Sequence, residues 1–436
     1  MANDVEHILE RLRSGVVPHR SLETFAVGIE KSRAEINRQL DLAQSKEGAF
    51  KFLRGGYGCG KTFMSRLALL DAHSRNFAAS FVVVSENDLQ FHKFDEVYRR
   101  IMQELSTAYC DRQALSDILD RWIGRVEEAL VNTGLDEDAP DFDERVAKRL
   151  EEDLVARTAG KVPQDMVRVL STIFRLKQER KNHEAGGLLS WLCGSRNVDA
   201  SIKRLAGLRG DISSSNALDY LHGILEIIKA ADYQGLVVVI DEAETILRSR
   251  RDVRGKTLNG IRQIIDASDR FRGMLWIFTG TPDFFDTTRG VAGLAPLHDR
   301  IAFQKNSQFV NVRQPQLELR PFDAARLKAV ALKLRELYPT QDRGRLERKV
   351  SEQVIESLVH KATRKFGGDV GVVPRQFLRS FVTMLDLVDQ EEAYDPATME
   401  GLDLGPITPE EERLVEGKPE YDPEPEDQQE YELVQF

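Results

Sequence analysis

One stretch of the sequence decides the fold, Phe50-Lys51-Phe52-Leu53-Arg54-Gly55-Gly56-Tyr57-Gly58-Cys59-Gly60-Lys61-Thr62. It is a short apolar run followed by the pattern G-x-x-x-x-G-K-T, and residues 63–70 after it have the composition of a helix. A strand, a glycine-rich loop and a helix in this order form the context in which such a loop holds phosphate groups. A glycine-rich turn that merely precedes a lysine would lack this context. The stretch therefore predicts a P-loop.

The residue types in this loop explain how it would hold a nucleotide. Glycines let the backbone curl with its N–H groups pointing inward, and the following helix adds the positive end of its dipole. Lys61 is placed to reach the β- and γ-phosphates, and the Thr62 hydroxyl is placed to ligate Mg²⁺. We expect contacts to a nucleoside triphosphate from Gly55, Gly56, Tyr57, Gly58, Cys59, Gly60, Lys61, Thr62 and Phe63.

A second stretch, Gly235-Leu236-Val237-Val238-Val239-Ile240-Asp241-Glu242-Ala243-Glu244, predicts hydrolysis. Its aliphatic run is typical of a strand buried on both faces of a parallel sheet, and ligands bind at the carboxyl ends of such strands. Asp241 would hold Mg²⁺, directly or through water, and Glu242 would polarise the attacking water. The alternative is a buried strand that ends in two solvated acids, and the P-loop upstream favours the catalytic interpretation.

Composition bounds the class of protein. The chain has 436 residues, 41% of them hydrophobic and 30% charged, which is enough for one large domain or two to three smaller ones. No apolar run approaches the roughly 20 residues that span a bilayer, and the acidic N-terminus lacks the core of a signal peptide. The three cysteines, Cys59, Cys110 and Cys193, lie far apart without metal-ligand spacing. We therefore expect a cytoplasmic protein without a membrane partner.

Charge is distributed unevenly along the chain. Residues 391–436 contain sixteen Asp and Glu against Arg413 and Lys418, a net −14, so residues 1–390 carry +4 of the total −10. This acidic tail also contains six prolines and little apolar periodicity, so we expect it to be disordered unless a partner orders it. The mildly basic remainder leaves nucleic acid possible as a partner.

Alternating strand and helix patterns predict an α/β fold with a parallel sheet flanked by helices. Further strands are expected at residues 81–84, 273–278 and 309–312, and residues 94–105 have helical periodicity. No strand pattern appears at about 110–218, which predicts a helical insertion, and residues 323–387 are helical throughout. We expect a P-loop core over residues 1–322, a small all-helical lid over 323–390, and the acidic tail over 391–436.

A basic segment follows the Asp241 strand and precedes a helix expected at 257–267. Such a segment can contact the phosphates of double-stranded DNA, or it can be a docking loop for a protein, and the sequence leaves both open. Its basic residues are Arg248, Arg250, Arg251, Arg254 and Lys256.

The order of P-loop, acidic strand, polar-ended strand, arginine and helical lid resembles the AAA+ ATPases, in particular the branch near origin-recognition initiators. The resemblance implies that Thr281, or as second choice Thr279, senses the γ-phosphate, and that Asn87 restrains the catalytic glutamate. It implies that Arg300 is an arginine finger, acting on a neighbouring subunit, and that Arg375 is the arginine of the lid that reaches the phosphates. Strand-end threonines and surface arginines without these roles are the plainer alternatives. ATP rather than GTP also follows from the resemblance, and no Asn-Lys-x-Asp motif for guanine occurs.

A closer resemblance, to the BrxD-type ATP-binding proteins of bacteriophage-exclusion (BREX) defence systems, covers most of residues 1–390. It rests on Pro18-His19-Arg20, Gly28-Ile29-Glu30, the P-loop with Tyr57, Ile240-Asp241-Glu242-Ala243-Glu244, Phe278-Thr279-Gly280-Thr281-Pro282 and Pro374-Arg375-Gln376-Phe377-Leu378. Origin-recognition initiators carry a winged-helix domain after the lid, whereas an acidic tail follows here, which argues against a role at a replication origin.

Together these patterns predict an ATP-binding and ATP-hydrolysing protein that needs Mg²⁺ and works with other phage-defence proteins. Double-stranded DNA and an ATP-dependent homo-oligomer are the further partners that we expect. Two alternatives stay open: a nucleotide-gated scaffold that turns over slowly and recruits effector proteins, and an initiator-like ATPase that loads onto DNA.

Overall fold

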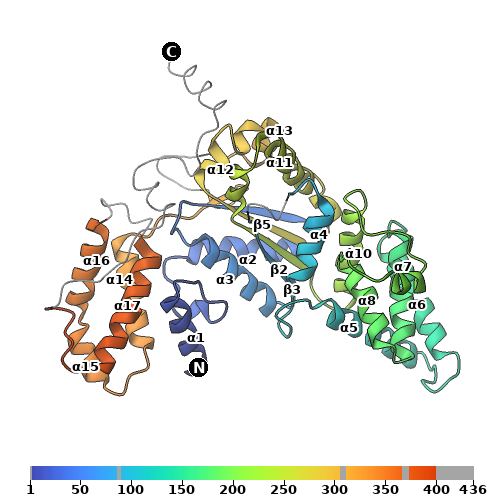
Figure 1. The fold of residues 1–436 in the computed structure, drawn as a ribbon, viewed down its shortest axis with the longest axis horizontal. Coiled ribbons are helices and arrows are strands. Elements are labelled where there is room, and N and C mark those ends of the chain that lie inside the picture. Colours follow the sequence, from blue (N-terminus) through green and yellow to red (C-terminus); the bar gives the residue numbers. More distant parts are fainter. Residues whose placement is uncertain (1, 86–89, 305–310, 366–372, 399–436) are drawn as a thin grey trace, which may run out of the picture.

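The computed structural model describes residues 2–85, 90–304, 311–365 and 373–398. Within them a six-stranded sheet lies at the centre, with a helical lid on one side and a helical arm on the other (Figure 1). The strand order is β3-β2-β4-β5-β1-β6, and every pair is parallel except β2 with β3. The strands are β1 (Ala49–Arg54), β2 (Ala78–Val83), β3 (Leu105–Ser106), β4 (Leu236–Asp241), β5 (Met274–Gly280) and β6 (Gln316–Glu318).

The sheet register brings the functional ends of three strands to one edge. Arg54 at the end of β1 is aligned with Gly280 at the end of β5, and Ile240 of β4 is aligned with Phe278 of β5. The glycine-rich loop after β1, Asp241 at the end of β4 and the threonines at the end of β5 therefore meet at the carboxyl edge, as expected for a parallel sheet.

Two hydrophobic clusters cover the two faces of the sheet, because successive side chains of a strand point to opposite faces. Phe52, Val238 and Phe278 belong to one cluster, while Leu53 and Val239 belong to the other. The helices with buried residues in the first cluster are α4 (Phe94–Gln103), α5 (Leu115–Asn132), α6 (Phe142–Arg157), α7 (Gln164–Gln178), α8 (Asn182–Leu192), α10 (Ala217–Ala230), α11 (Arg251–Asp266), α12 (Pro282–Asp286) and α13 (Ala295–Ile301).

The second face carries the helices of the P-loop, the N-terminus and the lid. They are α1 (Ala2–Arg13), α2 (Glu30–Gln44), α3 (Lys61–Ser74), α14 (Ala324–Leu337), α15 (Arg343–Lys349), α16 (Glu352–Lys365) and α17 (Val373–Gln390). Among the residues that the structure describes, no helix is long and apolar enough to cross a membrane.

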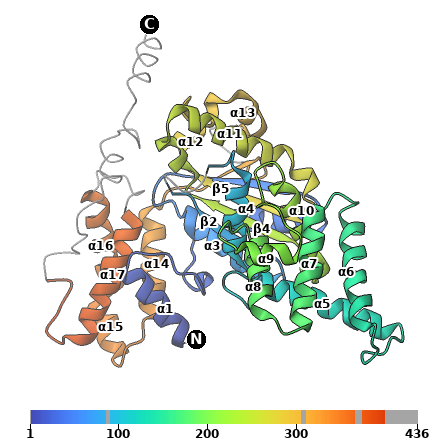
Figure 2. The same cartoon turned by 45° about the vertical axis from the view of Figure 1, so that its right-hand side comes forward.

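The helical insertion that the sequence predicts is present. Helices α5 to α8 with α9 (Ala200–Leu205) form the arm, which stands apart from the lid in both views (Figure 2). Its apolar residues are continuous with the cluster on the first face of the sheet, since α10 packs against both α4 and α5. The arm is thus an extension of the core rather than an independently packed unit.

Three sequence-based element predictions are wrong in detail. The helix expected to reach Leu105 ends at Gln103, and β3 follows it as a short antiparallel edge strand. The helix after the basic segment begins at Arg251 rather than at 257. The last strand is β6, at residues 316–318, instead of 309–312.

A buried lysine of β1, Lys51, explains the position of β6. Of the residues expected to form the last strand, 309 and 310 lie outside the described residues, and Val312 lies in a turn. Lys51 of β1 is fully buried and its Nζ donates to the backbone oxygens of Val312 (2.9 Å) and Gln314 (2.7 Å) as well as to Glu35 Oε1 (2.7 Å). These carbonyls satisfy a buried ammonium, so strand pairing with β1 begins only beyond them.

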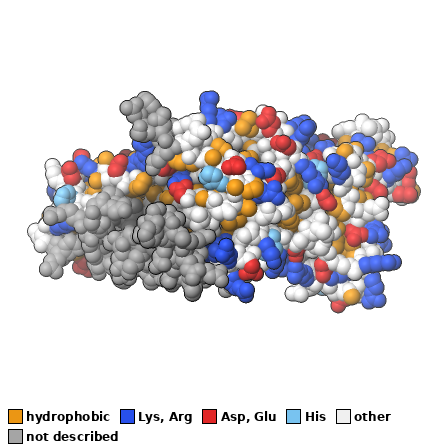
Figure 3. Space-filling view, turned by 90° about the horizontal axis from the view of Figure 1, so that it is seen from above, with side chains coloured by type: hydrophobic (Ala, Val, Ile, Leu, Met, Phe, Trp, Pro, Cys, Tyr) orange, Lys and Arg blue, Asp and Glu red, His pale blue; other side chains and the backbone are white. Residues whose placement is uncertain are grey.

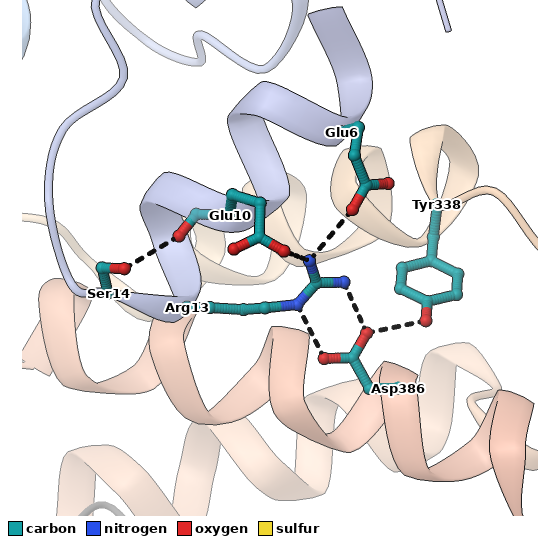
Figure 4. A network of polar contacts seen from close by, with 6 residues as sticks. All are labelled: Glu6, Glu10, Arg13, Ser14, Tyr338 and Asp386. Atoms are coloured by element: carbon teal, nitrogen blue, oxygen red, sulfur yellow. Dashed lines mark hydrogen bonds and ion pairs between the residues drawn. The ribbon is translucent and has the colours of Figure 1, made fainter. Parts of the chain in front are cut away.

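The N-terminal helix contacts the lid, although the sequence analysis places it in the core. Arg13 of α1 donates to Asp386 of α17 from Nε (2.8 Å) and Nη2 (2.7 Å), and Tyr338 Oη donates to the same carboxylate at 2.7 Å (Figure 4). Glu10 and Glu6 accept from Arg13 Nη1 at 2.7 and 3.2 Å. One guanidinium therefore joins the first and the last described helices.

Replacing Asp386 by Ala is expected to lower the free energy of unfolding by about 1 to 2 kcal/mol, because the half-buried carboxylate accepts three hydrogen bonds. The midpoint of urea unfolding, followed by circular dichroism, measures the change. The control is Glu6→Gln, which removes an exposed member of the same network and should change the midpoint little. Equal effects of the two variants would contradict the role given to Asp386.

Candidate nucleotide-binding site

The glycine-rich loop joins β1 to α3 in a conformation that suits a phosphate. Gly58 (φ 72°) and Gly60 (φ 87°) have left-handed backbones, which favour glycine, and Gly60 is the residue that precedes α3. At Gly55, a Cβ atom would lie only 3.1 Å from the backbone oxygen of Leu319 and from Cys59 Cβ. The loop therefore packs closely on the segment after β6, and the sequence prediction of a P-loop holds in its geometry.

Lys61 folds back over the mouth of the loop. Its Nζ donates to the backbone oxygens of Gly55 (2.9 Å) and Gly56 (3.2 Å) and lies 5.2 Å from the centre of the Tyr57 ring. It also lies 3.4 Å from Glu244 Oε1. The ammonium is thus held inside the site where a phosphate of a nucleotide would bind.

Asp241 is the central acceptor of the site. Its side chain is almost completely buried; Oδ2 accepts from Thr62 Oγ1 (2.8 Å), and Oδ1 accepts from Thr279 Oγ1 (2.7 Å). The Thr279 oxygen in turn accepts from the backbone N–H of Glu242 at 2.9 Å. The P-loop helix, β4 and β5 are therefore tied together through one carboxylate.

The pair of Thr62 and Asp241 fits the predicted Mg²⁺ site. A hydroxyl and a carboxylate oxygen at 2.8 Å from each other are hard ligands of the kind that Mg²⁺ takes. Among the described residues no group of three or more His, Cys, Asp or Glu gathers as a metal site. Phosphate oxygens and water would therefore complete the coordination, which is the usual arrangement for Mg²⁺ at a nucleotide.

Glu242 lies beside this pair in an uncommon backbone conformation. Its φ of 62° falls in the left-handed region, which costs a residue with a side chain about 1 kcal/mol or more. The side chain lines the cavity described below, and partial burial together with the negative charges of Asp241 and Glu244 raises the pKa of its carboxyl. A carboxylate with a raised pKa at this place can accept a proton from water.

Glu244 has no role that follows from the sequence, yet the structure places it in the site. Its side chain is buried, burial raises its pKa, and its Oε2 atom has no hydrogen-bond partner among the described residues. A lone acid two residues after Glu242 carries no signal by itself. The spacing of residues after β4 does not reveal that the Glu244 side chain lies next to Lys61.

A cavity of about 890 Å³ opens above the P-loop, between the core, the N-terminal segment and the lid. Its polar lining includes the P-loop, Glu242 and Glu244. The lining also includes apolar side chains, which suit a nucleobase and which the sequence did not identify. They are Val17, Phe25, Val27, Ile29, Phe322 and Leu378.

The two threonines considered as γ-phosphate sensor lie at the end of β5 and directly after it. Thr279, the second choice, contacts Asp241, as described above. Thr281, the first choice, is fully buried and directly precedes α12. Which of the two senses the γ-phosphate stays a prediction.

The two arginines of the resemblance lie in different places. Arg375 of α17 lines the cavity, and its Nε donates to the backbone oxygen of Gly15 at 2.6 Å. Arg300 of α13 does not line the cavity and pairs with Asp266 of α11. Its role on a neighbouring subunit stays a prediction. Asn87 lies outside the described residues.

The basic segment is divided between a short 3-10 helix (Ala243–Arg248) and the start of α11. The prediction for Arg254 as a DNA contact is wrong, because its side chain is 5% exposed and donates to the backbone oxygen of Ser249 at 2.8 Å. Its position on the buried face of α11, one turn after Arg250, explains the difference. The other four basic residues of the segment are exposed; they are Arg248, Arg250, Arg251 and Lys256.

A glycine-rich loop between β1 and α3, the hydrogen-bonded pair of Thr62 and Asp241, and the carboxylate of Glu242 beside it define the chain as a P-loop nucleotide-binding protein of the α/β class. The family model described as "BREX system ATP-binding protein BrxC/D" matches residues 1–403. The chain belongs to this family.

Other comparisons add little. A comparison with curated proteins found none that matches the chain. Among solved structures, the chain is similar to one in "Structure of Drosophila ORC bound to DNA", at 12% sequence identity and a TM-score of 0.38. The match covers 88% of this chain and 66% of that chain.

Replacing Thr279 by Val is expected to weaken Mg²⁺-dependent ATP binding by about five- to tenfold, since Asp241 loses one of the two hydroxyls that orient it. Isothermal titration with and without Mg²⁺ measures the effect. Thr281→Val is the matched variant and is expected to change this affinity less than twofold. A loss confined to Thr281→Val would give Thr281 the sensor role instead.

Proposed function

We propose that this protein hydrolyses ATP in a Mg²⁺-dependent reaction and serves as the ATPase of a phage-defence complex. The observation that carries the proposal is the contact between Thr62 and Asp241, with Glu242 at the edge of the same cavity. Membership of a family of BREX ATP-binding proteins supports the substrate and the setting.

Each residue has a task in the proposed reaction. Lys61 and the loop N–H groups bind the β- and γ-phosphates, and the apolar wall of the cavity receives the base. Thr62 and Asp241 would hold Mg²⁺, which offsets the charge of the phosphates. Glu242 orients a water molecule and accepts its proton, while Arg375 approaches the phosphates from the lid.

The lid can couple nucleotide binding to the arrangement of the lid relative to the core. Arg375 and Leu378 of α17 line the cavity, and α17 is tied to α1 through Arg13 and Asp386. A nucleotide that contacts both the P-loop and α17 therefore favours one arrangement of lid and core over others. We propose that this arrangement creates the contact surface for a second subunit, on which Arg300 would act as the resemblance implies.

Glu242→Gln is expected to reduce steady-state ATP hydrolysis at least 100-fold while ATP affinity stays within about threefold of the wild type, because only the proton acceptor is lost. Phosphate release measures turnover, and light scattering in the same samples measures assembly. Hydrolysis that persists in the variant would contradict the role of Glu242. ATP binding by the wild type with negligible turnover would favour the slow nucleotide-gated scaffold.

Double-stranded DNA is the second partner that we propose, through the exposed part of the basic segment. Arg248, Arg250, Arg251 and Lys256 are exposed, with Arg250 paired to Asp252 at 3.5 Å. On the upper face of the molecule Lys and Arg side chains are interspersed with Asp and Glu (Figure 3). Contacts between these side chains and phosphates would release counterions, so binding should weaken as the salt concentration rises.

Simultaneous replacement of Arg250, Arg251 and Lys256 by Ala is expected to weaken binding to a 20-base-pair duplex at least tenfold at low salt, with ATP affinity unchanged. Fluorescence anisotropy measures the affinity. Arg254 is retained, since it is buried. The matched control replaces Arg149, Lys161 and Arg209, which are exposed on the arm and carry the same charge. Equal losses in both triple variants would refute a specific DNA surface at α11.

A further inference from the structure

A buried ion pair in the lining of the cavity joins Lys61 and Glu244. Nζ and Oε1 are 3.4 Å apart, and the side chains are 8% and 6% exposed. Both residues line the cavity, so the pair is buried by the protein and yet adjoins the space that the phosphates would occupy. The reaction proposed above uses Lys61 and gives Glu244 no task.

The donors of Lys61 are fully used by the protein. An ammonium group has three N–H donors. Nζ has three acceptors within reach, the backbone oxygens of Gly55 (2.9 Å) and Gly56 (3.2 Å) and the Glu244 carboxylate (3.4 Å). A phosphate oxygen can therefore bind Lys61 only when one of these acceptors is released.

The carboxylate is the acceptor that conflicts with a phosphate. It makes the longest of the three contacts, and it has the same sign of charge as the incoming group. Its other oxygen, Oε2, is buried with no hydrogen-bond partner among the described residues. When Lys61 turns to a phosphate, the buried carboxylate loses its cation, which is unfavourable in a site shielded from water.

We propose that Glu244 competes with the phosphates of the nucleotide for Lys61, so that the pair lowers nucleotide affinity and favours nucleotide release. The inference rests on the proposed nucleotide-binding function and adds a residue that sets the affinity of that site. Glu244 acts through Lys61 and is a positioning residue, separate from Glu242, which would act on water. After hydrolysis, the carboxylate recaptures the ammonium and thereby assists the departure of ADP.

The test is the Glu244→Gln variant, which keeps the shape of the side chain and removes its charge. ATP, ADP and AMP are titrated against a fluorescent ADP analogue in the presence of Mg²⁺. ATP and ADP should bind the variant about tenfold more tightly than the wild type, the change expected when a charged hydrogen bond no longer has to be broken. AMP should bind both proteins equally, because its single phosphate does not reach Lys61.

Two further variants control the experiment. Glu47→Gln makes the same change of charge at an exposed position just before β1, at the opposite end of the sheet, and should leave all three affinities unchanged. Glu244→Ala should also bind ATP and ADP more tightly than the wild type. This variant keeps the test valid if the amide of Gln binds Lys61. Thermal unfolding without nucleotide confirms that each variant is folded.

The outcomes separate this inference from the proposed function. A wild type that binds ATP, with unchanged or weaker binding by Glu244→Gln, overturns the inference alone. Equal tightening by Glu47→Gln, or equal tightening for AMP, also overturns it, because the effect would then not pass through Lys61. If neither the wild type nor the variant binds nucleotide, the proposed function fails and the inference fails with it.

Discussion

The structure depends on the two hydrogen bonds that the Asp241 carboxylate accepts. One comes from Thr62 at the start of α3 and the other from Thr279 near the end of β5, and both donors are held at normal hydrogen-bond lengths. Because the carboxylate is almost fully buried, leaving either oxygen without a donor would be unfavourable. The P-loop helix, the acidic strand and the strand between them are thus locked in one register, and Glu242 receives its position from the same threonine.

The remaining architecture places a cavity against this fixed edge. The sheet is packed on both faces, so its own strands leave no room for a ligand, and the cavity instead opens where the N-terminal segment, α14 and α17 meet the P-loop. The cavity lining combines two carboxylates and an ammonium with apolar side chains. Such a lining suits a ligand with a charged tail and a flat, weakly polar head, which is the chemistry of a nucleotide.

Local patterns in the sequence predict the part of the site that local structure determines. The glycine loop, the aliphatic strand before Asp241 and the helical arm were all predicted, because each depends on residues that are neighbours in the chain. The failures involve distant contacts. The last strand follows two carbonyls that bind buried Lys51, Arg254 faces inward from α11, and Phe25 lines the same cavity as Leu378 of the lid. The contact between Thr279 and Asp241 likewise joins two strands that are distant in the sequence.

The bond between Arg13 and Asp386 has a consequence for synthesis. The two residues are 373 positions apart, so α1 emerges from a ribosome long before its partner α17 exists. At about 5 to 20 residues per second, the delay is on the order of 20 to 75 s. During that time the apolar side of α1, with Ile8 and Leu9, lacks its final cover from α17. The nascent chain must therefore tolerate an exposed amphipathic helix, and assembly of the lid is a late event that completes the nucleotide cavity only when nearly the whole chain has been translated.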